Sequence, residues 1–224
     1  MSATGRSDDE HVRAWAELHA TEPPGGFVGG WLRASAAVAR PLAKAGVSPN
    51  AVTVAALVAA LAALPAVLID GWLGPFIACV TVTVSGLLDA LDGAVAVQAG
   101  RTTKVGYLLD SALDRIADAA FPVALAVVAG APPALPVAAV AACWYLEYVR
   151  ARMNLALAPE ERGRQVITPG ERPTRIVLTA VGLGLPFLAE AALWGHVVVV
   201  GGSALFLLAH AVRRLDRVDR GTAG

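Results

Sequence analysis

Long apolar stretches are the feature that most constrains the fold of this chain. A hydrocarbon layer of about 30 Å takes roughly 20 helical residues to cross. Five stretches reach or nearly reach that length, and a sixth carries charges inside it. With 56% hydrophobic residues, only 16% charged residues and a mean hydropathy of +0.61, the chain is more apolar than a usual soluble domain. We therefore predict an all-α integral membrane protein with six transmembrane helices, near Ala51–Ile69, Leu73–Ala99, Lys104–Val128, Pro133–Leu155, Arg175–Leu193 and Val197–Val212.

The segment before the first span has an amphipathic pattern. Trp31, Leu32 and Val38 alternate there with basic residues, which suits a helix lying along the membrane interface, although an ordinary amphipathic soluble helix has the same pattern. The N-terminus is polar and acidic, with a short helix expected around Ala14–Leu18, and it does not resemble a cleavable signal peptide. The expected organisation is a polar tail (1–26), an interfacial helix (27–46), a six-helix membrane domain (47–215) and a C-terminal tail (216–224).

The distribution of basic residues predicts the orientation. All 18 Lys and Arg residues lie in the N-terminal region, in the turn after span two, near the start of span three, around the loop between spans four and five, or after span six, and the alternate loops "DGWLG", "GAPPALP" and "WGH" contain none of them. By the positive-inside rule, both termini of this multi-pass plasma-membrane protein are cytoplasmic.

A net charge of zero gives no sign of nucleic-acid binding. We expect His196 and His210, near the ends of the last span, to be interfacial.

Four aspartates stand out against these apolar surroundings. Asp89 and Asp92 are three residues apart and Asp110 and Asp114 are four apart, so each pair lies on one helix face. The turn near Gly100 makes their helices antiparallel neighbours, and Asp92 and Asp110 both lie about 12 to 15 Å from that turn, so the two pairs are level. Four carboxylates at one depth would repel one another and lose hydration, so a positive charge is needed among them.

Divalent cations are the simplest source of that charge. Mg²⁺, Mn²⁺ and Ca²⁺ prefer carboxylate oxygens, and four such ligands can hold two ions. Gly93 and Gly106 lie beside the carboxylates, where the backbone either approaches a bulky ligand or allows close helix packing. A carboxylate cluster of this kind also suits an ion pathway, so a second chemical signal is needed.

Arginines around the loop between spans four and five supply that signal. Four guanidinium groups are expected at the cytoplasmic level of the metal site, where their planar forks suit phosphate oxygens: Arg150, Arg152, Arg172 and Arg175. The alternative is that they only set topology or contact lipid headgroups. Metals beside a phosphate-binding cavity indicate phosphoryl-type transfer, in which one carboxylate deprotonates the attacking hydroxyl. A cation transporter using the same carboxylates is the competing hypothesis.

These residues resemble the signature of the CDP-alcohol phosphotransferases, D-x2-D-G-x2-A-R-x8-G-x3-D-x3-D. Seven of its eight specified positions agree here, from Asp89 to Asp114. The resemblance extends to "GVSPNAVT" before the first span and to "EYVRAR" and "ERPTRIVL" around the loop between spans four and five. The last two are similar to actinobacterial phosphatidylinositol-phosphate synthases. Roughly Arg40 to Leu215 is covered.

The resemblance implies a membrane homodimer that synthesises phospholipid by displacing CMP from a CDP-lipid such as CDP-diacylglycerol. The metal ligands would be Asp89, Asp92, Asp110 and Asp114, holding two Mg²⁺ or Mn²⁺ ions, with Asp114 doubling as general base. The positions that match contacts of the CDP moiety are Asn50, Thr53, Gly93, Thr103 and Gly106. The four arginines would bind a phosphorylated acceptor, inositol phosphate or glycerol phosphate, and inositol phosphate is our first choice.

One position departs from the signature. Its arginine is Val97 here, followed by Gln98, so a charge expected near the nucleotide phosphates is missing. Arg101, Lys104 or Arg115 could supply it; a different donor or an inactive paralogue are the alternatives. Beyond the signature, we expect Asp118 to pair with an arginine or a hydroxyl, and Glu147 to orient Arg150 or Arg175.

Overall fold

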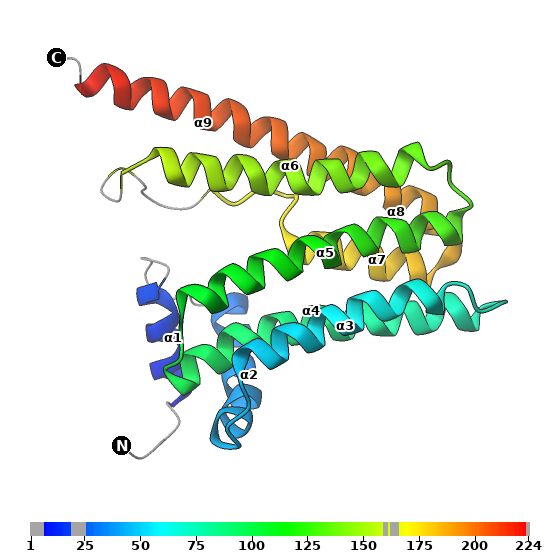
Figure 1. The fold of residues 1–224 in the computed structure, drawn as a ribbon, viewed down its shortest axis with the longest axis horizontal. Helices are drawn as coiled ribbons and strands as arrows, with labels where there is room; N and C mark the ends of the chain where they lie inside the picture. Colours follow the sequence, from blue (N-terminus) through cyan, green and yellow to red (C-terminus); the bar gives the residue numbers. More distant parts are fainter. Residues whose placement is uncertain (1–6, 19–25, 159–160, 162–165, 223–224) are drawn as a thin grey trace. The chain divides into compact units, whose positions relative to one another are not determined.

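The computed structural model of the chain describes residues 7–18, 26–158, 161 and 166–222. Over these residues the regular structure is helical, without a strand (Figure 1), which confirms the predicted all-α class. In chain order the elements are α1 (Asp8–Leu18), α2 (Gly26–Lys44), α3 (Pro49–Ala66), α4 (Leu73–Ala99), α5 (Lys104–Ala129), α6 (Ala134–Ala156), α7 (Arg172–Gly184), η2 (Pro186–Leu188), α8 (Ala189–Gly195), η3 (His196–Val200) and α9 (Gly201–Thr222).

Glycines end the helices where the sequence predicted turns. Gly100 after α4 and Gly130 after α5 adopt left-handed φ angles of 61° and 60°. At the first of these ends, the Arg101 N–H donates to the carbonyl of Ala96 (3.0 Å) and the Gly100 N–H to that of Val97 (3.3 Å). These two hydrogen bonds satisfy two carbonyls that have no partner within the helix. Glycine adopts the required φ without steric cost.

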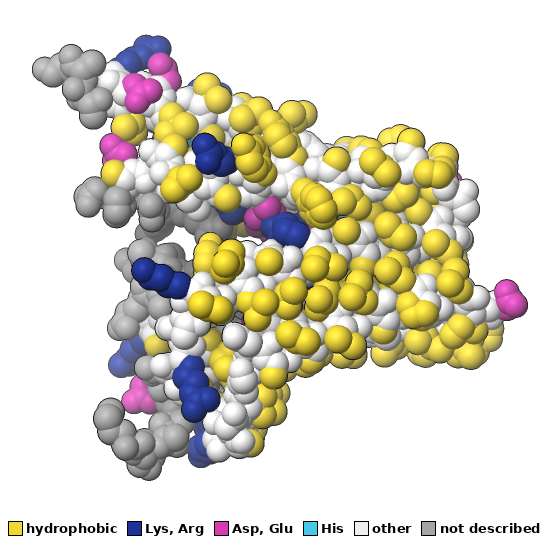
Figure 2. Space-filling view, in the orientation of Figure 1, with side chains coloured by type: hydrophobic (Ala, Val, Ile, Leu, Met, Phe, Trp, Pro, Cys, Tyr) yellow, Lys and Arg dark blue, Asp and Glu magenta, His cyan; other side chains and the backbone are white. Residues whose placement is uncertain are grey.

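Among the described residues, three helical stretches are long and apolar enough to cross a membrane: Pro49–Ala66, Leu73–Ala99 and Pro186–Arg220. α5 and α6 are also long, with 26 and 23 residues, but both carry several charges along part of their length. Hydrophobic side chains dominate the face shown in Figure 2, and large ones such as Val58 and Val137 are exposed, as contact with lipid requires. The count of six crossings stays a prediction.

The last two predicted spans are corrected by the structure. We expected a helix to Leu193 and a turn at "WGH", whereas α7 already stops at Gly184 and packs against α8. Helical structure then continues through α8, the π-helical turn η3 and α9. Helix α9 also includes most of the segment 216–224, which we expected to be a tail. The turn lies at Pro186, because proline has no N–H and disfavours helical backbone at the residue before it.

The expected N-terminal tail contains a formed helix over its described residues. The Ser7 hydroxyl accepts from the Glu10 N–H (3.3 Å), and the Glu10 carboxylate accepts from the Ser7 N–H (2.7 Å). This reciprocal capping box begins α1, and the acidic residues of its first turn suit the positive end of the helix dipole. The sequence "SDDE" carried this signal.

The described residues divide into two compact units, one within Met1–Ala60 and Val84–Ile116, the other within Leu61–Thr83 and Ala117–Gly224. In the first unit, Ala39 of α2 packs against Ala94 and Val95 of α4. In the second, α6 packs along α9 through a core that includes Leu146 and Leu207. The aspartates of the signature lie in the first unit, and the four arginines lie in the second.

Candidate active site

Three of the four aspartates come together within the first unit. One carboxylate oxygen from each of Asp89, Asp92 and Asp110 lies within 4.8 Å of the others. The spacing explains this arrangement: Asp89 and Asp92 share a face of α4, and the turn at Gly100 brings the first turns of α5 back alongside. The predicted meeting of carboxylates from α4 and α5 is therefore confirmed for these three residues.

The chemistry of this three-carboxylate group fits a divalent cation. Asp92 is 8% exposed, and its Oδ2 is buried without a hydrogen-bond partner among the described residues. A buried polar atom left unpaired costs about 1–3 kcal/mol, and more if charged, so the group is unfavourable without a counter-charge. Hard divalent ions take carboxylate oxygens and would remove both the repulsion and the missing contact.

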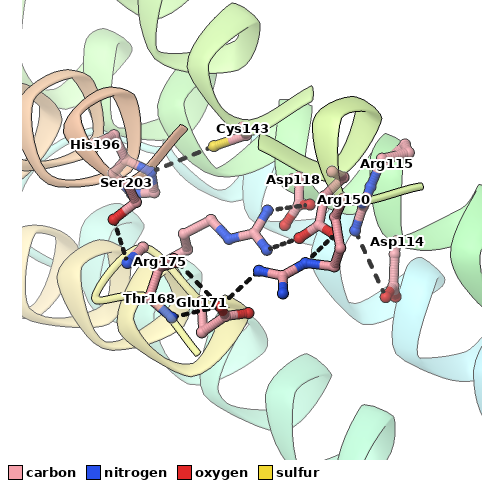
Figure 3. Close-up of polar contacts among 12 residues, drawn as sticks. Asp114, Arg115, Asp118, Cys143, Arg150, Thr168, Glu171, Arg175, His196 and Ser203 are labelled. Carbon is pink, nitrogen blue, oxygen red and sulfur yellow. Dashed lines mark hydrogen bonds and ion pairs between the residues drawn. The ribbon is translucent and has the colours of Figure 1, made fainter. Parts of the chain in front are cut away.

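Asp114 lies one helical turn beyond Asp110 on α5 and outside that 4.8 Å group. Its Oδ2 lies 3.8 Å from Nη2 of Arg115 (Figure 3), and its side chain is 16% exposed. The four-residue spacing keeps Asp114 on the helix face of Asp110. Its roles as fourth ligand and as general base stay predictions.

The residues predicted to contact the CDP moiety also lie in the first unit. A Cβ placed on Gly106 would lie 3.2 Å from Oδ1 of Asn50 and 3.1 Å from Oγ1 of Thr103, so these three residues are neighbours. Thr103 also caps α5, since its hydroxyl accepts from the Gly106 N–H (2.9 Å). A Cβ on Gly93 would meet no atom of the described residues within 4 Å, which favours room for a ligand over close helix packing at that position. Thr53 is buried and donates to the Pro49 carbonyl.

The position of the missing signature arginine is buried. Val97 and Gln98 are 5% and 7% exposed. Of the three basic residues considered as substitutes, Arg101 and Lys104 are exposed, and Arg115 is the one paired with an aspartate of the signature.

A buried ion-pair network joins α5, α6 and α7 in the second unit (Figure 3). Arg175 donates from Nη1 to Oδ2 of Asp118 (2.6 Å) and from Nη2 to Oε1 of Glu147 (2.7 Å). The side chains of Arg175 and Asp118 are 1% and 0% exposed. The predicted pairing of Asp118 with an arginine is confirmed, and so is the contact of Glu147 with Arg175.

Arg150 extends the network to the segment before α7. Its Nη2 donates to Oε1 of Glu171 (2.6 Å), its Nη1 donates to the Val166 carbonyl (2.9 Å), and its Nε lies 3.4 Å from Oε2 of Glu147. The same oxygen of Glu171 accepts from the N–H and the hydroxyl of Thr168 (2.9 and 3.0 Å). The arginine therefore ties α6 to the chain that leads into α7.

The four arginines differ in exposure. Arg150 and Arg175 are buried and paired with carboxylates of their own chain, Arg172 is half-buried, and Arg152 is exposed. Arg152 thus has the most accessible guanidinium of the four. That these residues bind the acceptor stays a prediction.

A family model described as CDP-alcohol phosphatidyltransferase matches residues 46–208, which is most of the chain. The chain belongs to the CDP-alcohol phosphatidyltransferase family. It is accordingly a multi-pass membrane transferase of phospholipid synthesis, and family membership gives no support to the cation-transporter hypothesis.

Relatives in this family have closely related names. The chain is 39% identical over 145 residues to the archaetidylinositol phosphate synthase of Aeropyrum pernix, covering 65% of this chain and 72% of that protein. It is 31% identical over 186 residues to the phosphatidylinositol phosphate synthase of Cutibacterium acnes, covering 78% and 84%.

The fold is shared with the phosphatidylinositol phosphate synthase of Mycobacterium tuberculosis, at 24% identity. The crystal structure of that protein with CDP-DAG bound gives a TM-score of 0.61 over 82% of this chain and 94% of the other. A second structure, in complex with manganese and citrate, gives 0.59 over 81% and 88%.

Two features of this family member escaped the sequence analysis. Glu171 was not singled out, although it directly precedes the Arg-Pro start of α7, and its carboxylate accepts hydrogen bonds from Arg150 and Thr168. His196 was expected at the membrane interface, but it is fully buried, with Nε2 3.0 Å from Oγ1 of Thr179 and Nδ1 4.0 Å from Sγ of Cys143. His196 is buried because the chain forms no turn at "WGH" and continues there as packed helical structure.

Proposed function

We propose that this chain transfers a phosphatidyl group from a CDP-diacylglycerol-type lipid to a phosphorylated alcohol, inositol phosphate, and releases CMP. The observation that carries the proposal is the three-carboxylate group of Asp89, Asp92 and Asp110, which is built from both halves of the family signature and contains a buried oxygen with no hydrogen-bond partner among the described residues. The names of the relatives supply the lipid and the acceptor.

The residues that would hold the metal are Asp89, Asp92 and Asp110, with Asp114 as the fourth ligand of a two-ion site. The Mycobacterium tuberculosis synthase was solved with manganese, which supports Mn²⁺ or Mg²⁺ here. Bound cations would offset the negative charge that develops on the diphosphate as it separates from the lipid.

The chain's own residues would perform three tasks. Asn50, Thr103 and Gly106 are neighbours, and with Thr53 and the open space at Gly93 they would hold the CDP moiety. Asp114 would take the proton of the acceptor hydroxyl while the hydroxyl oxygen of the acceptor forms a bond to the lipid-linked phosphorus. The bond from that phosphorus to the CMP oxygen breaks, and CMP leaves with the electron pair.

Arginine chemistry supports a phosphorylated acceptor. A guanidinium binds phosphate oxygens in a planar, two-point geometry, and Arg152 and Arg172 are the less buried members of the predicted set. Arg150 and Arg175 are neutralised by Glu147, Asp118 and Glu171, so their role would be to hold the segment around α7 in place. We further propose a homodimer in the plasma membrane with the active site on the cytoplasmic side.

The test is CMP release by the purified full-length enzyme with Mn²⁺ and CDP-diacylglycerol. Inositol phosphate, glycerol phosphate and free inositol are compared as acceptors, and we expect release with inositol phosphate to be fastest. Asp114→Asn should lower the rate by about 100-fold or more, because general-base catalysis contributes roughly 10²–10⁴-fold.

Asp70→Asn, an exposed carboxylate in the loop between α3 and α4, is the matched control and should retain the wild-type rate. Absence of CMP release with every acceptor would contradict the proposed transfer. Faster release with glycerol phosphate would replace the proposed acceptor and leave the transfer reaction standing.

A further inference from the structure

Helix α1 is docked onto α2 within the first unit (Figure 1). Asp9 pairs with Arg33 at 3.1 Å, and Asp8 pairs with Arg40. Exposed ion pairs of this kind contribute at most about 1 kcal/mol each, so the burial of apolar side chains carries more of the docking. Val12 and Ala16 of α1 are 3% and 2% exposed.

The docked face of α1 also carries a buried polar side chain. His11 is 1% exposed, and its Nδ1 lies 3.4 Å from Nε2 of Gln98, near the end of α4. Gln98 is itself 7% exposed. A polar contact withdrawn from water between two helices is directional, unlike the apolar contacts around it.

α1 and α2 together support the side of α4 that faces away from the metal ligands. On α4, Ala94 and Val95 pack with Ala39 of α2, and Gln98 contacts His11 of α1. The residues of the candidate site on α4 are Asp89, Asp92 and Gly93. With 3.6 residues per turn, the centres of the two sets lie about 170° apart around the helix axis.

Small apolar side chains alone would leave the rotation of α4 poorly defined. The contact of α2 with α4 is made by Ala39, Leu42, Ala94 and Val95, whose side chains form no directional bonds. A rotation of about 10° moves an atom roughly 6 Å from the helix axis by about 1 Å, whereas metal–ligand distances tolerate about 0.2 Å. A directional contact on the side of α4 opposite the aspartates would therefore fix the rotation of the helix and with it the positions of Asp89 and Asp92.

We propose that His11 is a positioning residue: through Gln98 it sets the rotation of α4 and so the placement of Asp89 and Asp92 for the cation. His11 is held in place by the docking of α1 on α2. This inference rests on the proposed function, because it assigns α1 to the metal site of the transferase.

The experiment measures Mn²⁺ binding to the full-length protein by calorimetry, for His11→Ala, Gln98→Ala and the double variant. We expect the Mn²⁺ dissociation constant to rise about threefold to tenfold in each single variant, as the loss of one buried hydrogen bond predicts. The double variant should bind Mn²⁺ no more weakly than the single variant with the larger dissociation constant, because both substitutions remove the same contact between His11 and Gln98. His11→Gln, which keeps a polar side chain of similar reach, should restore most of the affinity.

Arg13→Ala is the matched control, because Arg13 is an exposed residue of the same helix. It should bind Mn²⁺ like wild type. In assays of CMP release, His11→Ala and Gln98→Ala should raise the KM for the CDP-lipid while the KM for the acceptor stays within twofold.

Wild-type Mn²⁺ affinity in His11→Ala, or strictly additive effects of the two substitutions, would overturn the proposal. Equal rises in both KM values with a lowered thermal midpoint would also overturn it, because they indicate a merely structural contact. If wild type binds Mn²⁺ but releases no CMP, the proposed function fails, and the binding data still decide the role of His11.

Discussion

Asp92 carries a charge that burial and two neighbouring carboxylates make unfavourable in the metal-free protein. It is 8% exposed and lies within 4.8 Å of two other carboxylates. Asp92→Asn removes one of three repelling charges, so we expect it to stabilise the metal-free protein by about 1 kcal/mol. The thermal midpoint of the metal-free variant should then lie a few °C above that of metal-free wild type. Added Mn²⁺ should stabilise wild type and leave the variant nearly unchanged. Thermal unfolding with and without Mn²⁺ measures both effects, and an intact Mn²⁺ response in Asp92→Asn would remove this residue from the site.

Asp118 makes the opposite kind of contribution, since its charge is paired with that of Arg175. Asp118→Asn would leave the guanidinium of Arg175, 1% exposed, with one carboxylate instead of two. Breaking a buried pair costs about 3–5 kcal/mol, so the thermal midpoint should fall by about 10 °C.

The control for that change is Asp216→Asn. Its ion pair with Arg220 lies at the surface, with side chains 53% and 78% exposed, and should contribute less than about 1 kcal/mol. Equal destabilisation by the two substitutions would show that the buried network does not hold α5, α6 and α7 together.

At the scale of elements, close packing of α7 depends on glycine. A Cβ on Gly182 would lie 2.6 Å from Cδ2 of Leu125 on α5 and 2.7 Å from Cβ of Ala192 on α8. Gly182→Ala should therefore destabilise the protein by about 1–3 kcal/mol, although alanine is the better helix former. Thermal unfolding against wild type gives the sign.

Gly202→Ala in α9 is the matched substitution with the opposite expectation. A Cβ there meets nothing within 4 Å, so the helix should gain about 0.5–1 kcal/mol. A stabilised Gly182→Ala variant would mean that α5 and α8 do not approach α7 as closely as the structure shows.

At the scale of the whole molecule, the distribution of Lys and Arg predicts which loops face the cytoplasm. In a background with Cys79→Ala and Cys143→Ala, Asp70→Cys in the loop between α3 and α4 should react with a membrane-impermeant maleimide added outside intact cells. Asp216→Cys near the C-terminal end of α9 should react only after the membrane is dissolved. The reverse pattern would invert the predicted orientation.

Much of this molecule follows from local chemistry. Apolar length predicted the helical class, glycines predicted the ends of α4 and α5, and the spacing of Asp89, Asp92 and Asp110 predicted that their carboxylates meet. Each of these results depends on the period of the helix or on one turn, and so can be derived from a short stretch of residues.

Other features depend on residues far apart in the chain. The partners of Arg175, the burial of His196 and the contact between His11 and Gln98 arise only when separate helices pack. No periodicity specifies which carboxylate meets which guanidinium, because that choice depends on the rotation and depth of each helix. Local patterns therefore identified the chemistry of the chain, while packing decided which of its carboxylates gather together and which pair with an arginine.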